Sequence, residues 1–202
     1  KRFRDFEDAQ RKDVKNRARL CRQEIDFVLS RKDDCGVLMN QLEEGKLPLR
    51  VTHNDTKLNN ILFDKDTDKG LCIIDLDTIM PGLAANDFGD SIRFGASTAE
   101  EDEQDLDKVH FNISLYDIYV KGYLEMAKDV LTPEEIKSLP WGARLMTLEC
   151  GMRFLADFLQ GDVYFKTAYP EHNLVRARTQ FRLVKEMEEQ FDEMNEILKK
   201  YI

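Results

Sequence analysis

The sequence predicts an α+β protein that is mostly helical, with one small β unit at about residues 49–76. Apolar residues recur at steps of three and four along most of the 202 residues, which is the spacing of a buried helix face. Only residues 49–76 show short apolar runs separated by polar turns, as strands do. A chain of this length is long enough for one sizeable hydrophobic core.

Two helices are predicted before the β unit. The first covers about residues 7–32, and its apolar face is formed by Val14, Ala18, Cys21, Ile25 and Val28 or Leu29. The second covers about residues 35–44, where Gly45 and Pro48 stop it.

The β unit holds three predicted strands, LRVTH, NILFD and LCIID, at residues 49–53, 60–64 and 71–75. The polar sequence KDTDKG between the second and third strands predicts a turn. The order strand, loop, strand, turn, strand predicts a compact hairpin-like unit. It should present the loop 53–60 beside Asp75.

Five helices are predicted after the β unit, near residues 88–97, 108–129, 133–138, 142–160 and 172–201. The third has the clearest start, because Thr132 suits the N-cap position and Pro133 suits the first helical position. The two glutamates that follow suit the positive end of the helix dipole. The last helix carries apolar residues at helical spacing, which predicts a core-facing side made of Leu174, Ala177, Phe181, Val184, Met187, Phe191, Met194 and Leu198.

The composition argues against several classes of function. The net charge of −9 argues against nucleic acid or an anionic membrane as a partner, because phosphates need a basic face. The four cysteines are scattered, which predicts neither a zinc site nor a disulfide framework. With no apolar run of about 18 residues and no leader, we expect a cytoplasmic protein without a membrane span. The start at Lys1, within a charged helical pattern, is typical of a fragment.

The loop HNDTKLNN is the strongest functional signal. As an ordinary loop it would need no further explanation, since Asn and Asp are common turn residues. However, its spacing H-x-D-x-K-x-x-N is that of the protein-kinase catalytic loop, with Asn54 in place of the arginine. Phosphoryl transfer needs a carboxylate, a cation and an oxygen ligand for Mg²⁺. Asp55, Lys57 and Asn60 can supply these, while His53 braces the loop.

Asp75 is the expected second ligand of Mg²⁺. It lies twenty residues after Asp55, at the end of an apolar strand, in the role that the DFG aspartate has in protein kinases. Here the triplet is Asp75-Leu76-Asp77. Two aspartates at the end of a buried strand are difficult to explain by packing, because buried charge is costly. The loop and the triplet together predict a site for Mg²⁺ and ATP.

The stretch THNDTKLNNILFDKDTDKGLCIIDLDTIMPGL, residues 52–83, resembles the aminoglycoside phosphotransferase and choline kinase superfamily. Within that superfamily it looks closest to the N-acetylhexosamine 1-kinases, which phosphorylate the anomeric hydroxyl of N-acetylglucosamine or N-acetylgalactosamine. The resemblance implies that residues 1–202 form a protein-kinase-like C-terminal lobe. It also implies Mg²⁺ and ATP as cofactors and a small sugar as acceptor.

Carried over to single residues, the resemblance implies Asp55 as catalytic base and Asn60 and Asp75 as ligands of the metal and its nucleotide. It also implies a set of sugar-binding residues, namely Asp77, Phe94, Arg153 and Tyr164. Simpler interpretations exist for part of this set. Phe94 can be core, and Arg153 can form an i,i+4 ion pair with Asp157.

A similar structural alternative applies to Asp87 and Asp90, which can cap the helix that they begin. The sequence also departs from the kinase pattern in its first 48 residues. There we recognise no phosphate-covering loop, no strand lysine and no helix glutamate. We therefore expect the C-terminal lobe alone. By itself it should bind nucleotide poorly and catalyse little, because most of the rate comes from clamping on both sides.

Other functions stay open. LCIIDLDTI also approximates the strand end of haloacid dehalogenase-like phosphatases, with Asp75 as nucleophile, although this leaves residues 53–60 unexplained. A non-catalytic, regulatory kinase-like module is a second alternative. Choline, an aminoglycoside or homoserine can replace the sugar as acceptor. Cationic acceptors usually need further carboxylates or an aromatic cage.

Overall fold

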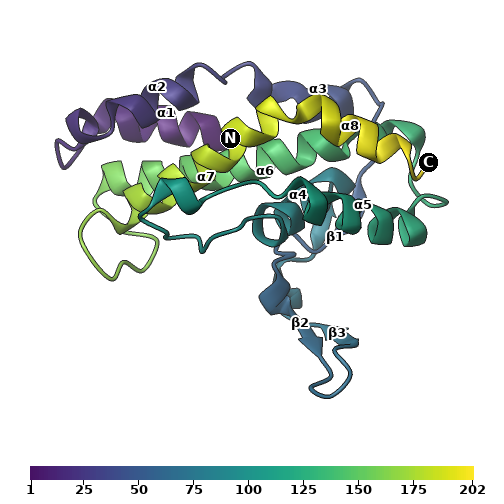
Figure 1. Cartoon of the computed structure of the whole chain (residues 1–202). Coiled ribbons are helices and arrows are strands. Elements are labelled where there is room, and N and C mark those ends of the chain that lie inside the picture. The colour runs from purple at the N-terminus through teal and green to yellow at the C-terminus, as the bar shows by residue number, and fades with distance from the viewer. The chain divides into compact units, whose positions relative to one another are not determined.

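The computed structural model describes all 202 residues and confirms a mostly helical α+β chain (Figure 1). Its α-helices are α1 (Arg2–Lys12), α2 (Arg22–Leu29), α3 (Val37–Glu43), α4 (Ala84–Gly95), α5 (Ile113–Ala127), α6 (Pro133–Gln160), α7 (His172–Glu189) and α8 (Phe191–Lys199). Its strands are β1 (Arg50–Thr52), β2 (Ile61–Phe63), β3 (Gly70–Ile73) and β4 (Met80–Gly82). No helix combines the length and the apolarity that crossing a membrane requires.

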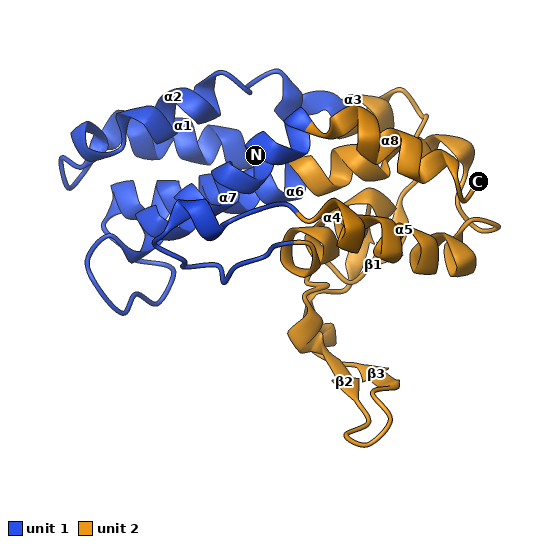
Figure 2. Ribbon diagram, viewed as in Figure 1, with its two compact units in different colours: residues 1–37, 97–111, 145–189 blue, residues 38–96, 112–144, 190–202 orange.

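The chain forms two compact units, each assembled from three separate segments (Figure 2). Unit 1 contains Lys1–Val37, Ser97–Phe111 and Leu145–Glu189, and unit 2 contains Leu38–Ala96, Asn112–Arg144 and Gln190–Ile202. The core of unit 1 is a cluster of buried apolar side chains that includes Phe6, Ile25, Phe158, Leu174 and Val184. In unit 2, the buried Phe88 of α4 packs edge-on against Tyr116 of α5, with 6.1 Å between their ring centroids.

The single helix predicted at 7–32 is wrong, because the chain breaks between α1 and α2. Asp13 ends α1 in the left-handed conformation, with a φ of 35°. Its carboxylate accepts hydrogen bonds from the backbone N–H groups of Arg17, at 2.7 Å, and Ala18, at 3.2 Å. An aspartate that bonds nearby backbone groups competes with the helix in this way. Cys21, Ile25 and Val28 of the predicted face are buried on or beside α2, whereas Leu29 is exposed and so is Val14 in the break.

Two other helix boundaries also differ from the prediction. The helices expected at 133–138 and 142–160 form the single helix α6, with Pro140 inside it. Leu139 and Ala143 are fully buried on either side of this proline, so tertiary packing outweighs its low helix propensity. The helix expected at 172–201 divides into α7 and α8 at Gln190. The predicted N-cap is confirmed, since the Thr132 hydroxyl accepts a hydrogen bond from the N–H of Glu135 at 3.2 Å.

The strands form two antiparallel pairs, and only one of them was predicted. β2 and β3 form the expected hairpin, with Ile61 opposite Ile73 and Leu62 opposite Cys72. β1 does not join this hairpin and pairs with β4 instead, with Arg50 opposite Gly82. The loop 53–60 therefore connects β1, in one two-stranded sheet, with β2, in the other.

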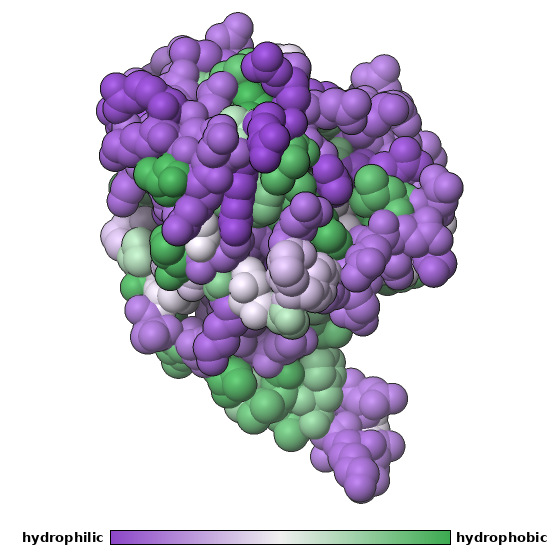
Figure 3. Space-filling view, turned by 90° about the vertical axis from the view of Figure 1, so that its left-hand side faces the viewer, coloured by the Kyte–Doolittle hydropathy of each residue, from purple (hydrophilic) through white to green (hydrophobic).

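The expectation that β3 is a buried strand is also wrong, because all four of its residues are exposed. The hairpin extends away from the helices of unit 2 (Figure 2). Apolar surface covers its base, and hydrophilic surface covers its turn (Figure 3). An apolar run in a sequence predicts a strand, but it does not reveal whether anything covers that strand.

Candidate active site

Asp87, in the first turn of α4, holds the beginning of the loop 53–60. One oxygen of its carboxylate accepts a hydrogen bond from the N–H of His53 at 2.7 Å, and the other accepts from the N–H of Asn54 at 2.8 Å. The Thr56 hydroxyl donates to the backbone carbonyl of Asp87 at 2.6 Å. The hydroxyl of Ser91, one turn later, donates to the carbonyl of Thr56 at 3.0 Å. These four bonds fix the loop backbone on α4.

The capping role expected for Asp87 and Asp90 is wrong. Leu83 is the N-cap residue of α4, and it forms no side-chain cap. The carboxylate of Asp90 instead forms an ion pair with Arg93 at 2.9 Å. Asp87 lies in the first turn of α4, where acidic residues often interact with the helix end. Its carboxylate instead accepts a hydrogen bond from the N–H of His53, more than thirty residues earlier in the chain.

Asn54 adopts the left-handed conformation, with a φ of 65°. Asparagine is one of the few residues that tolerate this conformation. Its side-chain N–H₂ donates to the carbonyls of Thr52, at 3.1 Å, and Thr78, at 3.0 Å. Its side-chain oxygen accepts from the hydroxyl of Thr52 at 3.0 Å. This residue, which departs from the kinase pattern, therefore ties the loop to the segment that follows Asp75.

His53 braces the loop against the end of the hairpin. Its Nε2 lies 3.0 Å from the carbonyl oxygen of Ile74, the residue before Asp75. A carbonyl only accepts hydrogen bonds, so this contact assigns the proton to Nε2. The hydroxyl of Thr78 donates to the carbonyl of His53 at 2.6 Å. The histidine ring is therefore engaged in holding the loop.

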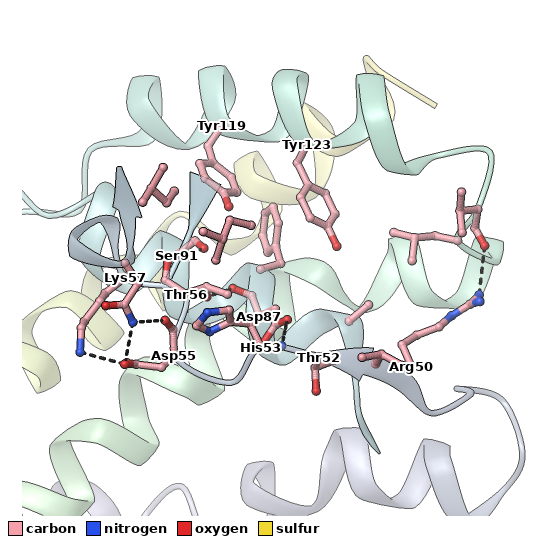
Figure 4. A pocket seen from close by; sticks show the side chains of 18 residues that line it. Arg50, Thr52, His53, Asp55, Thr56, Lys57, Asp87, Ser91, Tyr119 and Tyr123 are labelled. Atoms are coloured by element: carbon pink, nitrogen blue, oxygen red, sulfur yellow. Dashed lines mark hydrogen bonds and ion pairs between the residues drawn. The ribbon is translucent and has the colours of Figure 1, made fainter. Parts of the chain in front are cut away.

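Asp55 lies at the centre of a compact polar cluster (Figure 4). One of its carboxylate oxygens accepts hydrogen bonds from Lys57 Nζ and Asn60 Nδ2, both at 2.8 Å. Asn60 is buried, and its Nδ2 also donates to the carbonyl of Asp55 at 2.8 Å. Burial raises the pKa of the Asp55 carboxyl. The hydrogen bonds from Lys57 and Asn60 and nearby positive charge lower it by more, so the pKa lies below its ordinary value of 3.8. The carboxylate is thus ionised near neutral pH.

Asn60 and Asp75 lie at the same end of the hairpin. The carbonyl of Asn60 accepts a hydrogen bond from the N–H of Ile74 at 2.9 Å, and Asp75 follows directly. Asp75 is exposed and adopts the left-handed conformation, with a φ of 64°. Such a conformation is uncommon for a non-glycine residue and often occurs at functional sites. Asp77 lies two residues further, in the short 3₁₀ helix Leu76–Thr78, and it is also exposed.

Asn60 and Asp75 fit the way in which proteins bind Mg²⁺. The N–H₂ group of Asn60 points to Asp55, which leaves its side-chain oxygen as a ligand atom. Asp75 adds a carboxylate. No cluster of three or more His, Cys, Asp or Glu side chains forms a complete metal site. Mg²⁺ usually takes one or two protein ligands together with substrate phosphates, so a pair of oxygen ligands is the set expected when ATP supplies the others.

A pocket of about 470 Å³ lies beside the loop within unit 2. Asp55, Thr56 and Lys57 line one part of it, and Tyr119 and Tyr123 extend into it from α5 (Figure 4). The two tyrosine rings stack with 6.3 Å between centroids. Burial raises the pKa of Tyr123 to about 12, so its hydroxyl stays protonated and can donate a hydrogen bond. These tyrosines could not be predicted as site residues, because their helical spacing is also that of a core helix.

The predicted sugar residues are divided between the two units. In unit 1, the guanidinium carbon of Arg153 lies 5.9 Å from the ring centroid of Tyr164 and 5.4 Å from that of Phe165. These three residues line a pocket of about 270 Å³. Phe94 and Asp77 belong to unit 2. Phe94 is 36% exposed, so the interpretation as core is wrong.

The alternative interpretation of Arg153 and Asp157 as an i,i+4 ion pair is also wrong. Asp157 is buried, and its carboxylate accepts hydrogen bonds from three consecutive backbone N–H groups, those of Val163, Tyr164 and Phe165. Its charge is therefore satisfied by the loop after α6. The guanidinium of Arg153 lies against aromatic rings instead.

Comparison with known families agrees with this geometry. Residues 1–124 match the Phosphotransferase enzyme family, which is more than half of the chain. The matched region contains the loop 53–60, the hairpin, Asp75 and Asp87. It therefore includes every contact described around Asp55. The chain belongs to the Phosphotransferase enzyme family.

Proposed function

We propose that this chain supplies the catalytic residues of a Mg-ATP-dependent kinase that phosphorylates the anomeric hydroxyl of an N-acetylhexosamine, such as N-acetylglucosamine or N-acetylgalactosamine. Membership of the family supports phosphate transfer to a small molecule. The observation that carries the proposal is the cluster of Asp55, Lys57 and Asn60 on a loop that α4 holds in place. It combines an ionised carboxylate, a cation and a metal-ligand oxygen within six residues.

Asp55 orients the acceptor hydroxyl and receives its proton. In the reaction, the hydroxyl oxygen forms a bond to the γ-phosphorus of ATP, and the bond from that phosphorus to the bridging oxygen breaks, which releases ADP. Because the pKa of Asp55 is lowered, the carboxylate is ready to accept a hydrogen bond at neutral pH. Lys57 offsets negative charge on the group in transfer.

Asn60 and Asp75 would hold Mg²⁺ with the nucleotide phosphates. When bound there, the cation neutralises charge that develops on the phosphates. The Asn60 side chain has two tasks, since its nitrogen donates to Asp55 while its oxygen faces away as a ligand atom. The position of the base is therefore coupled to the position of the metal ligand.

The pocket in unit 1 supports a neutral sugar as acceptor. Its lining includes two arginines, Arg2 and Arg153, and two aspartates, Asp5 and Asp157, so its charges balance. The exposed ring of Tyr164 offers an aromatic face to the apolar side of a sugar ring, and Arg153 offers several N–H donors to sugar oxygens.

A cationic acceptor, such as choline or an aminoglycoside, is the second candidate. One observation favours it. In the pocket beside the loop, the rings of Phe88, Tyr119 and Tyr123 form an aromatic wall near the carboxylates of Asp55 and Asp87. Aromatic faces and carboxylates together attract organic cations. The acceptor assay below separates the two candidates.

The test uses the full gene product that contains these 202 residues, incubated with Mg-ATP and N-acetylglucosamine, N-acetylgalactosamine, choline or kanamycin. Phosphorus NMR identifies each product. We expect an anomeric phosphate on one of the two sugars. Transfer to choline or kanamycin alone would replace the sugar by the cationic acceptor. An absence of transfer to all four would refute the assignment of an acceptor from this panel.

The matched variant is Asp55→Asn, which keeps the shape of the side chain and removes its charge. We expect turnover to fall by about 10²-fold or more, as for loss of a general base, while the affinity for Mg-ATP stays within about two-fold. Glu125→Gln, on the exposed face of α5, is the control. Undiminished turnover in Asp55→Asn would remove Asp55 from the mechanism.

Asp75→Ala tests the metal site. We expect this variant to lose most of its affinity for Mn²⁺ with ATP, measured by the electron paramagnetic resonance signal of free Mn²⁺. Asp66→Ala, in the exposed turn of the same hairpin, removes an equal charge and should leave the affinity unchanged. Equal Mn²⁺ affinity in Asp75→Ala and the unaltered protein would show that Asp75 is not a ligand.

A further inference from the structure

The loop that follows α6 combines an exposed surface with a tightly bonded backbone. Val163 and Tyr164 are 72% and 73% exposed, so their side chains contribute little to the core. Exposed loops of this kind are usually mobile. Here, however, three consecutive backbone N–H groups are bound by one buried side chain. The arrangement fixes the backbone that carries an aromatic side chain facing solvent.

Asp157 is the residue that binds this loop. Its Oδ1 accepts from the N–H groups of Val163 at 2.9 Å and Tyr164 at 2.8 Å, and its Oδ2 accepts from that of Phe165 at 3.0 Å. Asn173 of α7 donates a fourth hydrogen bond to Oδ2 at 2.9 Å. A carboxylate that is only 3% exposed would be strongly unfavourable without such donors, so the four bonds explain how this charge is tolerated.

A second set of contacts holds the start of the loop. The Asn173 side chain also donates to Asp162 at 2.9 Å, and the guanidinium of Arg17 donates to the same carboxylate at 2.5 Å. Gly161 and Asp162 both have positive φ values, 100° and 61°, which turn the chain sharply after α6. The loop is therefore fixed by side chains from three helical regions of unit 1.

Core packing accounts for only part of this network. Phe165 does pack into unit 1, with its ring centroid 4.6 Å from that of Phe154. Tyr164 instead faces outward beside Arg153, which precedes Asp157 by one helical turn on α6. Asp157 thus sets the position of the Tyr164 backbone relative to the helix that carries Arg153. A structural requirement for Phe165 alone would not need a bond to the Tyr164 N–H.

We propose that Asp157 is a positioning residue that preorganises Tyr164 beside Arg153 for binding of the acceptor. The inference rests on the proposed function, because it takes these two side chains as contacts of an N-acetylhexosamine. A preorganised loop binds more tightly, since it loses less conformational freedom when the ligand binds. Asp157 also lines the pocket, but both of its carboxylate oxygens are engaged by the loop and Asn173, so it acts on the acceptor through Tyr164. Its effect is on affinity.

The first experiment measures order in the loop. Amide hydrogen exchange by NMR is compared between the 202-residue chain and its Asp157→Asn variant. An asparagine would turn an N–H₂ group toward backbone N–H donors, so exchange at residues 163–165 should accelerate by at least ten-fold. Glu186→Gln is the matched control, because Glu186 is also buried and binds the backbone N–H of Phe111 in a different loop. Unchanged exchange at residues 163–165 would overturn the proposal.

The second experiment measures binding of N-acetylglucosamine by chemical-shift titration. We expect Asp157→Asn to raise the dissociation constant by about three- to ten-fold, the cost of ordering one or two residues on binding. In the full gene product, KM for the sugar should rise while kcat changes by less than two-fold. Tyr164→Ala should weaken binding, and Asp157→Asn should add little in that background, because both changes remove the same ring contact.

A second variant, Val163→Gly, tests the same proposal in case Asp157→Asn does not fold. Val163→Gly changes only an exposed side chain and increases backbone freedom, so it should also raise the dissociation constant while the chain stays folded. If Tyr164→Ala weakens binding but neither loop variant does, the positioning role is overturned and the proposed function stands. If the unaltered chain does not bind N-acetylglucosamine, the sugar assignment fails together with this inference. Accelerated exchange in Asp157→Asn would then establish a structural role only.

Discussion

Asp87 provides the sharpest test of how the candidate site is built. Its two carboxylate oxygens each accept one backbone N–H, from His53 and Asn54, just before Asp55, the proposed catalytic base. Replacing Asp87 with alanine removes both bonds and leaves two backbone donors without their partner. Hydrogen bonds to a charged group contribute about 1.5–3 kcal/mol each. Because Asp87 is only half-buried, water replaces part of the loss, and we expect a destabilisation of about 2–4 kcal/mol.

Urea unfolding of the 202-residue chain, followed by circular dichroism, measures this change. With a slope of about 2 kcal/mol per molar urea, a loss of 3 kcal/mol lowers the midpoint by about 1.5 M. Asp87→Asn should lose about half as much, because one side-chain oxygen still accepts a hydrogen bond. Glu125→Gln, exposed on α5, is the control. In the full gene product, kcat should fall in the same order as stability.

A midpoint shift below about 0.3 M in Asp87→Ala would refute this reasoning, because it would mean that the two bonds contribute almost nothing. A large loss of stability with normal kcat would also contradict it in part. The loop would then keep its geometry without the Asp87 carboxylate, and Asp87 would stabilise the fold without positioning Asp55.

Two further predictions concern packing and pH. Gly89→Ala should destabilise the chain by about 1–3 kcal/mol in thermal unfolding, because the added Cβ would overlap the backbone of Gly142, whereas Gly95→Ala on the same helix meets open space. Hydrogen bonds from Arg50 hold the pKa of Glu135 below its ordinary value of 4.5. Its contribution to stability is therefore fully present above pH 4.5 and is lost as the pH falls through the lowered pKa. The urea midpoint should fall with acid over this range, less steeply in Glu135→Gln, and an identical pH dependence in the two proteins would contradict the assignment.

The fold class and most helices could be predicted because helical periodicity is a local property of the sequence. The errors arise where a side chain acts on the backbone or where tertiary packing decides. Asp13 interrupts a periodic pattern by binding the next N–H groups, which no count of apolar residues detects. Pro140 leads to the opposite error. A proline predicts a break between two helices, but its buried neighbours keep it within the single helix α6.

The residues of the loop 53–60 could be predicted because their chemistry is compressed into eight positions. Their partners could not be predicted in the same way. Asp87 lies 33 residues after Asn54, to which it bonds, and Tyr119 comes from a helix later still. Only the fold brings them beside the loop. The sequence does contain one signal for the backbone of the loop. Asparagine in a polar loop often adopts the left-handed conformation, and Asn54 does so.

The sheet arrangement bears on the phosphatase alternative. That interpretation makes Asp75 the nucleophile and gives the loop 53–60 no task. In the structure, β3 pairs only with β2, in an exposed two-stranded sheet. Asp75 therefore does not end a buried strand, and the argument from the cost of buried charge no longer applies to it.

What singles out Asp75 is its left-handed backbone together with the hydrogen bond that joins Ile74 to Asn60. Asn60 in turn donates to Asp55. Asp75, Asn60 and Asp55 are thus connected through consecutive contacts along one end of the hairpin. A nucleophilic aspartate would not require this connection, whereas a base and two metal ligands that act on the same phosphate would. These contacts therefore support the proposed transfer from ATP over an aspartyl-phosphate at Asp75.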